Sequence, residues 1–368
     1  AGAAITLDEG LRRLIGWGIP PEIALAAATS RPADALGLNL GRIAPGALAD
    51  LVWWSEDFHA LQVWQAGQPG SQAVPRGTEA PRLELMDLEA RPTEEIIRLF
   101  LTQEATAQRA LNSTAPALAR LVDGVAARLA DGGRLFYAGA GTSGRLGLLD
   151  AVECRPTFGV APGLIVPLLA GGEGAFIQAA EGAEDDEEAA RAALDAHGFC
   201  ERDALVGIAA SGSTPYTLAA LRHAGGLGGL TGAIINNAAS PMAAAAQIAV
   251  EILSGPEIIA GSTRLSAGST EKIALNILSS TVMIRLNKTF GPFMVDMRAS
   301  NAKLRRRAVR MVTRLTGVNE QNASLELEAC DMHVKLAVLA IRLGLAPDLA
   351  RARLKGAGGS LRRALSLN

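Results

Sequence analysis

The stretch Arg134-Leu-Phe-Tyr-Ala-Gly-Ala-Gly-Thr-Ser-Gly-Arg145 decides the fold that we expect for this chain. Its apolar first half, Arg134–Ala138, predicts a short buried strand, and the glycines and hydroxyls that follow predict a turn into a helix. Backbone N–H groups at such a helix start, with the hydroxyls of Thr142 and Ser143, suit an anion such as phosphate. Serine and threonine also cap helices for purely structural reasons, so this loop alone does not establish a ligand site.

Four further apolar runs continue this pattern toward the C-terminus of the chain. Most are separated by helix-like segments, which is the βαβ signature of a doubly wound α/β fold with a parallel five-stranded sheet. In such sheets ligands bind at the carboxyl ends of the strands. The four additional strands are expected at Leu164–Leu168, Ala204–Ile208, Gly232–Ile235 and Ile248–Ile252.

A second loop of small and hydroxyl residues, Ser211-Gly-Ser-Thr214, follows another of these strands. Two such loops on one sheet favour phosphate binding over simple capping. A third segment, Gly261-Ser-Thr-Arg264, precedes a long apolar helix expected over Ser269–Leu286 and could add hydroxyls to the same cleft, or be a capped loop. Gly139–Gly144 also has the G-x-G-x-x-G spacing of dinucleotide-binding loops. This is a weak indication, because no acidic residue follows at the end of a second strand about 20 residues on. The predicted binding residues are Gly141, Thr142, Ser143, Gly144, Ser211, Gly212, Ser213, Thr214, Ser262 and Thr263.

Composition excludes several classes of function. The 368 residues are 49% hydrophobic with a formal net charge of -2, so nothing draws the chain toward nucleic acid or an anionic membrane. The basic run Lys303–Arg314 lacks interleaved aromatic residues and is expected to be a solvated helix face. Prolines and glycines interrupt the longest apolar stretch, Ala161–Ala180, so no membrane span is expected. Three dispersed cysteines indicate a reducing, cytoplasmic setting, and four isolated histidines predict neither a metal site nor a cofactor.

Aromatic usage divides the chain, because all four tryptophans lie within the first 64 residues and both tyrosines lie later. A glycine- and proline-rich connector lies between these two populations. We therefore expect an N-terminal segment over 1–68, a linker over 69–77, an α/β domain with a helical prelude over 78–304, and a helical C-terminal domain over 305–368.

Six motifs of this chain, in order, closely resemble those of N-acetylmuramic acid 6-phosphate etherases, and the likeness runs from about Thr78 to Leu365. The resemblance implies a sugar isomerase (SIS) domain, a cytoplasmic homodimer, a small-molecule sugar-phosphate substrate, and a role in recycling cell-wall amino sugars. The motifs are Gly139-Ala-Gly-Thr-Ser-Gly-Arg-Leu-Gly147, Asp150-Ala-Val-Glu-Cys-Arg-Pro-Thr-Phe-Gly159, Glu181-Gly-Ala-Glu-Asp185, Gly207-Ile-Ala-Ala-Ser-Gly212, Gly255-Pro-Glu-Ile-Ile-Ala-Gly-Ser-Thr-Arg264 and Met294-Val-Asp-Met-Arg-Ala-Ser-Asn301.

What the resemblance implies chemically is cleavage of the D-lactyl ether to give N-acetylglucosamine 6-phosphate and D-lactate. By motif, Glu153 matches the family's proton donor and Glu184 its second catalytic glutamate, here the expected base. One acid and one base cover proton removal at carbon 2, departure of lactate from carbon 3 and addition of water, with no metal. The hydroxyl loops would hold the 6-phosphate.

Three positions depart from the family's pattern. Ser213 stands where the family usually has arginine, Ser266 where it has lysine, and Glu271 where it has glutamine. The loss of two cations leaves a second reading open, a non-catalytic SIS regulatory protein that binds a sugar phosphate. The retained Glu153 and Glu184 favour the enzyme, and an aldose–ketose isomerase would not be expected to keep both motifs.

The first 68 residues resemble a different family, the tail of N-acetylglucosamine-6-phosphate deacetylase. The stretches that carry this likeness are Leu7–Arg13, Ala24–Gly37 and Gly41–Val52. That amidohydrolase family places its metal ligands and catalytic aspartate upstream of such a tail, and here only His59 occurs. We therefore expect a remnant that does not catalyse by itself.

Overall fold

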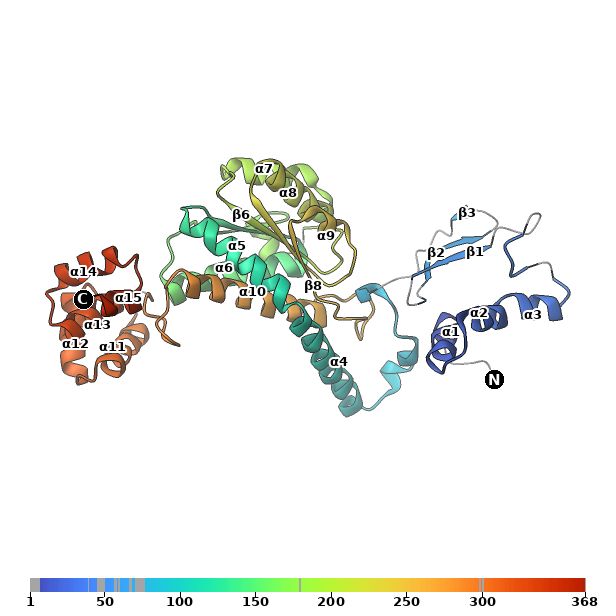
Figure 1. The fold of residues 1–368 in the computed structure, drawn as a ribbon, viewed down its shortest axis with the longest axis horizontal. Helices are drawn as coiled ribbons and strands as arrows, with labels where there is room; N and C mark the ends of the chain where they lie inside the picture. Colours follow the sequence, from blue (N-terminus) through green and yellow to red (C-terminus); the bar gives the residue numbers. More distant parts are fainter. Residues whose placement is uncertain are drawn as a thin grey trace. The chain divides into compact units, whose positions relative to one another are not determined.

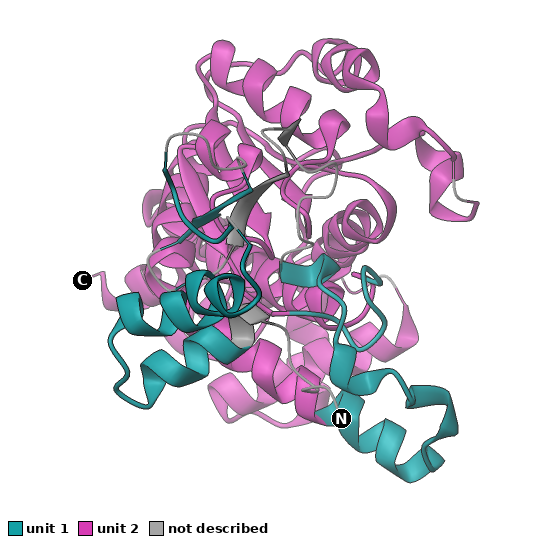
Figure 2. Cartoon of the chain, turned by 90° about the vertical axis from the view of Figure 1, so that its right-hand side faces the viewer, with its two compact units in different colours: residues 1–101, 256–262 teal, residues 102–255, 263–368 magenta. Residues whose placement is uncertain are grey.

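The computed structural model divides the chain into two compact units (Figures 1 and 2). The first comprises residues 1–101 with 256–262, and the second comprises residues 102–255 with 263–368. No helix within the part of the chain that the structure describes is long and apolar enough to cross a membrane. The structure describes residues 7–38, 40–44, 50–55, 58, 60–65, 68–69, 77–178, 180–297, 299 and 301–367.

The first unit combines short helices with a small antiparallel sheet of order β1-β2-β3. Its core is slight, because Leu11 and Ala24 are buried while Trp17 and Ile43 remain 77% and 92% exposed. The expected linker, 69–77, lies outside the described residues except at its two ends. The elements are α1 (Leu7–Gly16), α2 (Pro21–Ala28), α3 (Ser30–Ala35), β1 (Leu51–Trp54), β2 (Ala60–Gln65), β3 (Gln68–Pro69) and the 3-10 helices η1 (Gly77–Glu79), η2 (Leu83–Leu85) and η3 (Leu88–Ala90).

The second unit contains a five-stranded parallel sheet of order β5-β4-β6-β7-β8. All five expected strands form within one or two residues of their predicted bounds, so the predicted fold class is confirmed. The strands are β4 (Leu135–Gly139), β5 (Ile165–Leu169), β6 (Ala204–Ala209), β7 (Leu230–Ile235) and β8 (Ile248–Glu251).

Helices cover both faces of this sheet (Figure 1). Alternate residues of β4 enter opposite cores: Leu135 and Tyr137 pack with one set of helices, Phe136 and Ala138 with the other. Burial on both sides explains why the strands are continuous apolar runs. The first set is α5 (Ala115–Ala130), α6 (Gly141–Phe158) and α10 (Ser266–Arg285), and the second is α7 (Glu187–Ala196), α8 (Pro215–Gly226) and α9 (Pro241–Ala245). The helical prelude is α4 (Thr93–Ser113) followed by α5.

The helix after β4 extends beyond a proline. Proline commonly ends a helix, but α6 continues through Pro156 to Phe158 and ends at Gly159 in the left-handed conformation. Proline removes one backbone hydrogen bond and crowds the carbonyl four residues earlier, which weakens this last turn without ending the helix, and glycine is the usual residue for such a C-terminus. Glu153 therefore lies inside the helix and not at its end.

The C-terminal part of the second unit is helical, as predicted, with its own buried core. A buried ion pair joins these helices to the segment that precedes them. Lys335 Nζ donates to Asp296 Oδ2 at 2.8 Å and to the Gly359 carbonyl at 3.0 Å. Lys288 Nζ lies 3.1 Å from the same Asp296 oxygen. Burial lowers the pKa of Lys335, and Asp296 opposes that shift. The helices are α11 (Ala302–Thr316), α12 (Glu320–Ala329), α13 (Val334–Leu343), α14 (Pro347–Gly356) and α15 (Leu361–Ser366).

Replacing Lys335 by methionine is expected to lower the free energy of unfolding by about 2 kcal/mol, because it removes the buried donor to the Gly359 carbonyl and leaves Asp296 paired only with the more exposed Lys288. Urea unfolding followed by circular dichroism measures the change. Lys355→Met, on the exposed side of α14, is the matched control and is expected to change stability by less than about 0.5 kcal/mol. Equal losses in the two variants would show that the buried pair does not stabilise this region.

Candidate functional site

The two predicted anion-binding loops lie at the point of the sheet where the strand order reverses. We call Gly139–Arg145 the first cradle and Ser211–Thr214 the second cradle. From β4 the chain moves to β5 on one side, and then crosses to β6 on the other side of β4. The strands β4 and β6 are parallel neighbours with Gly139 opposite Ile208, so the loops that follow them leave the same edge. Crevices at such points bind ligands in open α/β sheets.

The first loop is a tight connection in which β4 ends at Gly139 and α6 begins at Gly141. A Cβ atom on Gly144 would lie 2.4 Å from the Gly139 carbonyl oxygen, so only glycine permits this approach of helix to strand. Thr142 and Ser143 occupy the first turn of α6 with half-buried side chains. N–H groups of a first turn have no partner within their helix and can point at an anion.

The second loop, Ser211–Thr214, connects β6 to α8, which begins at Pro215. Gly212 has a φ of +69° and is packed so closely that a Cβ would lie 2.3 Å from Ser240 Oγ. Ser211 Oγ accepts the Ser213 backbone N–H at 3.2 Å. The loop therefore presents three hydroxyls at the edge where the first cradle lies.

The third predicted segment is divided between the two units, with Ser262 in the first and Thr263 in the second. The Thr263 carbonyl accepts the Gly268 N–H at 2.9 Å. A Cβ built on Gly268 would lie 3.5 Å from Thr142 Cγ2. The structure thus brings the start of α10 against the first cradle.

Glu271, on the second turn of α10, belongs to this site although the sequence showed it only as a departure from the family. Its Oε1 lies 3.0 Å from Ser143 Oγ, and its side chain is fully buried. Its Oε2 is also buried and has no hydrogen-bond partner among the described residues. Burial raises the pKa of Glu271 to about 8, and the bond with Ser143 acts in the opposite direction. The signal in the sequence was the acid that stands at Glu271 where the family usually has glutamine.

Glu184, the expected base, lies on the 3-10 helix η5 (Ala183–Asp185) with an exposed side chain. The preceding chain passes through η4 (Glu173–Phe176) and folds back over the end of β5, where a Cβ on Gly171 would lie 2.6 Å from Ala180 Cβ and 3.3 Å from Ala183 Cβ. Because β5 is the parallel neighbour of β4, Glu184 comes to the same edge of the sheet as the cradles.

Glu153, the expected acid, is placed differently. It is exposed on α6, twelve residues after Gly141 and hence about 18 Å along the helix axis from the cradle. Its position on the unit is fixed by Asp150, one turn earlier. A single copy of the chain does not bring Glu153 to the two cradles.

Asp150 anchors α6 through a buried polar network that the sequence did not reveal. Its carboxylate accepts from Tyr137 Oη at 3.0 Å, Asn276 Nδ2 at 2.8 Å and Ser279 Oγ at 3.0 Å. Burial raises the pKa of Asp150, and these three bonds lower it. The network joins β4, α6 and α10, so it fixes the helix that carries both Ser143 and Glu153.

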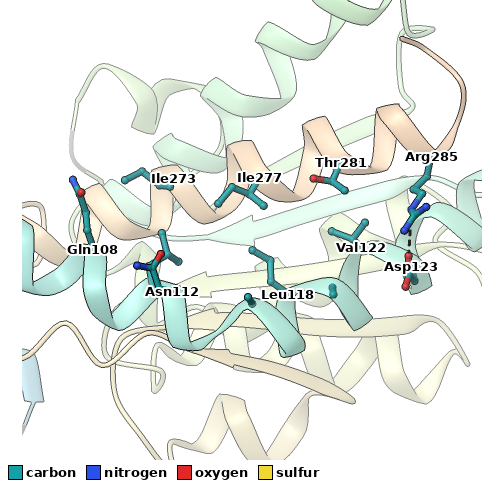
Figure 3. A pocket seen from close by; sticks show the side chains of 12 residues that line it. Gln108, Asn112, Leu118, Val122, Asp123, Ile273, Ile277, Thr281 and Arg285 are labelled. Atoms are coloured by element: carbon teal, nitrogen blue, oxygen red, sulfur yellow. Dashed lines mark ion pairs between the residues drawn. The ribbon is translucent and has the colours of Figure 1, made fainter. Parts of the chain in front are cut away.

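A separate apolar groove runs between α5 and α10, with a volume of about 480 Å³ (Figure 3). Leu118, Val122 and Ile277 line it, and an ion pair of 3.7 Å between Asp123 and Arg285 lies at one end. None of the predicted substrate-binding residues lines this groove. No group of three histidine, cysteine, aspartate or glutamate residues suited to a metal ion occurs within the described part of the chain.

Two family models match different parts of the chain. The model of the glucokinase regulatory protein N-terminal SIS domain matches residues 117–224, and that of the amidohydrolase family matches residues 1–70. Among solved structures, a phosphoheptose isomerase from Francisella tularensis covers 53% of this chain and 100% of its own, with a TM-score of 0.43 and 17% identity.

Curated relatives match over much greater lengths. An N-acetylmuramic acid 6-phosphate etherase of Streptomyces coelicolor is 47% identical over 296 residues, which cover 80% of this chain and 95% of the relative. One from Cronobacter sakazakii is 46% identical over 288 residues, which cover 78% of this chain and 97% of the relative. With this identity over nearly the whole length of its relatives, the chain belongs to the N-acetylmuramic acid 6-phosphate etherase family.

Proposed function

We propose that this protein is a lyase that cleaves the D-lactyl ether of N-acetylmuramic acid 6-phosphate. The observation that carries the proposal is the 47% identity over 95% of a curated etherase, in a chain that retains both glutamate motifs. The anion cradles at the switch point of the sheet suit the 6-phosphate. Release of D-lactate, followed with a D-lactate dehydrogenase, tests it.

The proposed roles follow from the chemistry of the open-chain sugar. The aldehyde acidifies the carbon-2 proton, which Glu184 removes. The electron pair left on carbon 2 forms a double bond to carbon 3 as the carbon–oxygen bond to lactate breaks, and Glu153 protonates the leaving oxygen. Water then adds at carbon 3 and a proton returns to carbon 2. The reaction uses protons and water alone, so no metal or cofactor is assigned. The setting we propose is the cytoplasm, in keeping with three free cysteines.

We further propose a homodimer whose sites are completed across the subunits. Glu153 lies about 18 Å along α6 from the cradle of its own chain, so a second copy would have to supply it. Apolar surface suited to such an interface is available on α10, where Ile277 and Ile284 are 41% and 53% exposed, and in the groove beside it. Light scattering is expected to give twice the chain mass of 38.1 kDa.

Mixing two inactive variants tests completion across subunits. Glu153→Gln and Glu184→Gln chains are denatured together and refolded, so that half of the dimers contain one chain of each kind. If the two glutamates of a site come from different chains, each mixed dimer has one intact site, and about one quarter of the wild-type activity returns. A stable monomer, or a mixture as inactive as its components, would contradict the proposal.

The N-terminal segment is proposed to be dispensable for catalysis. It matches the amidohydrolase family model, it does not contain the metal ligands that this family places upstream, and Ala1–Gly67 precedes a glycine-rich connector. Deleting 1–67 is expected to leave kcat/KM within a few-fold of the full chain, measured by lactate release. Insoluble or inactive protein after this deletion would show that the segment has become part of the folded core.

The second candidate function is a sugar-phosphate-binding regulatory protein. Ser213 and Ser266, which replace two cations, favour it, as does the match to the glucokinase regulatory protein SIS domain. Tight binding of N-acetylglucosamine 6-phosphate without any lactate release from the muramic substrate would support this alternative.

A further inference from the structure

The buried carboxyl of Glu271 contacts the first of the two predicted anion-binding loops. Ser143 Oγ, in the first turn of α6, lies 3.0 Å from Glu271 Oε1. Glu271 is fully buried, and its Oε2 has no partner among the described residues. An ionised carboxylate in such a place is unfavourable, because burial separates it from bulk solvent and, among the described residues, Ser143 alone donates to it.

The hydrogen-bond direction between these groups decides what Ser143 can offer a ligand. A hydroxyl has one proton, and an ionised carboxylate only accepts, so beside an ionised Glu271 the Ser143 proton is directed to the carboxylate. A neutral carboxyl can instead donate its own proton to Ser143 Oγ, which leaves the serine O–H free to donate to a phosphate oxygen. A glutamine amide, the residue usual in the family, donates in the same way at every pH.

We propose that Glu271 is a positioning and specificity-determining residue that must be neutral for tight binding of the sugar phosphate, so that its ionisation releases the ligand. Two effects act in the same direction. Ionisation turns the Ser143 hydroxyl away from the phosphate, and it places a negative charge beside a dianion in a poorly solvated site. The proposal rests on the proposed function only in placing the phosphate at the Ser143 cradle.

Charged groups on neighbouring elements do not offset this ionisation. Glu104 of α4 accepts from Ser269 Oγ, two residues before Glu271. Two charged residues of α6 have other partners. Arg145 donates to the Ala175 and Phe176 carbonyls, and Asp150 accepts from Asn276 on a later turn of α10. Lys272 is the next residue on α10 and acts on Asp150. The pKa of Glu271, raised to about 8, reflects burial and the Ser143 bond alone.

The expected result is a loss of affinity at alkaline pH. The phosphate group is already close to its dianion above pH 7, so its own titration ends before the change begins. At pH 9 about nine-tenths of a carboxyl with a pKa of about 8 is ionised, so the Kd for N-acetylglucosamine 6-phosphate should rise about tenfold between pH 7 and pH 9. Isothermal titration calorimetry on the full chain measures this binding without any turnover.

Two variants distinguish ionisation of Glu271 from a general effect of pH. Glu271→Gln keeps the shape of the side chain and the donor to Ser143, so it should bind as the wild type does at pH 7 and change by less than about twofold at pH 9. Glu104→Gln is the matched control, a glutamate that also contacts a serine of α10 but is only half-buried, and it should keep the tenfold change. Circular dichroism at pH 9 verifies that each variant is folded.

The outcomes separate this proposal from the etherase assignment. An equal rise in Kd for wild type and Glu271→Gln, a wild-type Kd that does not change with pH, or no binding at pH 7 would each overturn the role of Glu271. Binding with the expected pH dependence but no lactate release would uphold it and reject the etherase function. Lactate release with a KM that does not vary with pH would uphold the etherase and reject the role of Glu271.

Discussion

Glu153→Gln is expected to release D-lactate about 100- to 10,000-fold more slowly than the wild type, because the amide cannot protonate the leaving oxygen. The side chain is exposed on α6, so its replacement removes no buried contact. The protein should therefore fold normally and still bind the product. A coupled D-lactate dehydrogenase assay measures the loss, and Glu181→Gln, a neighbouring exposed acid of the Glu184 motif, should retain activity within a few-fold.

The same variant should keep the chemistry at carbon 2. If the base is intact, Glu153→Gln still exchanges the carbon-2 proton of N-acetylglucosamine 6-phosphate with deuterated solvent, which proton NMR detects. Loss of exchange in Glu153→Gln, with exchange retained in Glu184→Gln, would show that the acid and base roles are reversed.

Glu184→Gln is expected to abolish exchange and cleavage together, each by about 100- to 10,000-fold, because proton removal from carbon 2 precedes every later step. The Glu184 side chain is exposed on a 3-10 helix at the carboxyl edge of the sheet, so its replacement removes no buried contact and should not unfold the protein. Normal lactate release from both single variants would exclude both glutamates as catalytic groups.

Much of the fold could be predicted from the sequence, because the decisive residues act locally. Buried parallel strands require apolar runs, and Gly139, Gly144 and Gly212 are required where backbone and side chains approach too closely for a Cβ. The end of α6 could not be read from Pro156, because the helix continues past this proline to Phe158.

The site was predictable only in part. The positions of the loops that begin α6 and α8 could be predicted, because the strands and the loop residues are encoded locally, whereas their binding of phosphate stays a prediction. The contacts of Glu271 with Ser143, and of Asp150 with Asn276, join residues more than 120 positions apart, and no spacing in the sequence indicates them. The distance of Glu153 from the cradle follows from helix geometry, but only once the whole of α6 is known.

The most direct test of the central claim is the release of D-lactate from purified N-acetylmuramic acid 6-phosphate by the full chain, followed with D-lactate dehydrogenase. The etherase assignment predicts stoichiometric D-lactate and N-acetylglucosamine 6-phosphate, with one solvent oxygen incorporated at carbon 3 when the reaction runs in oxygen-18 water. Binding of the substrate with no lactate above the Glu184→Gln background would contradict it and favour the regulatory protein.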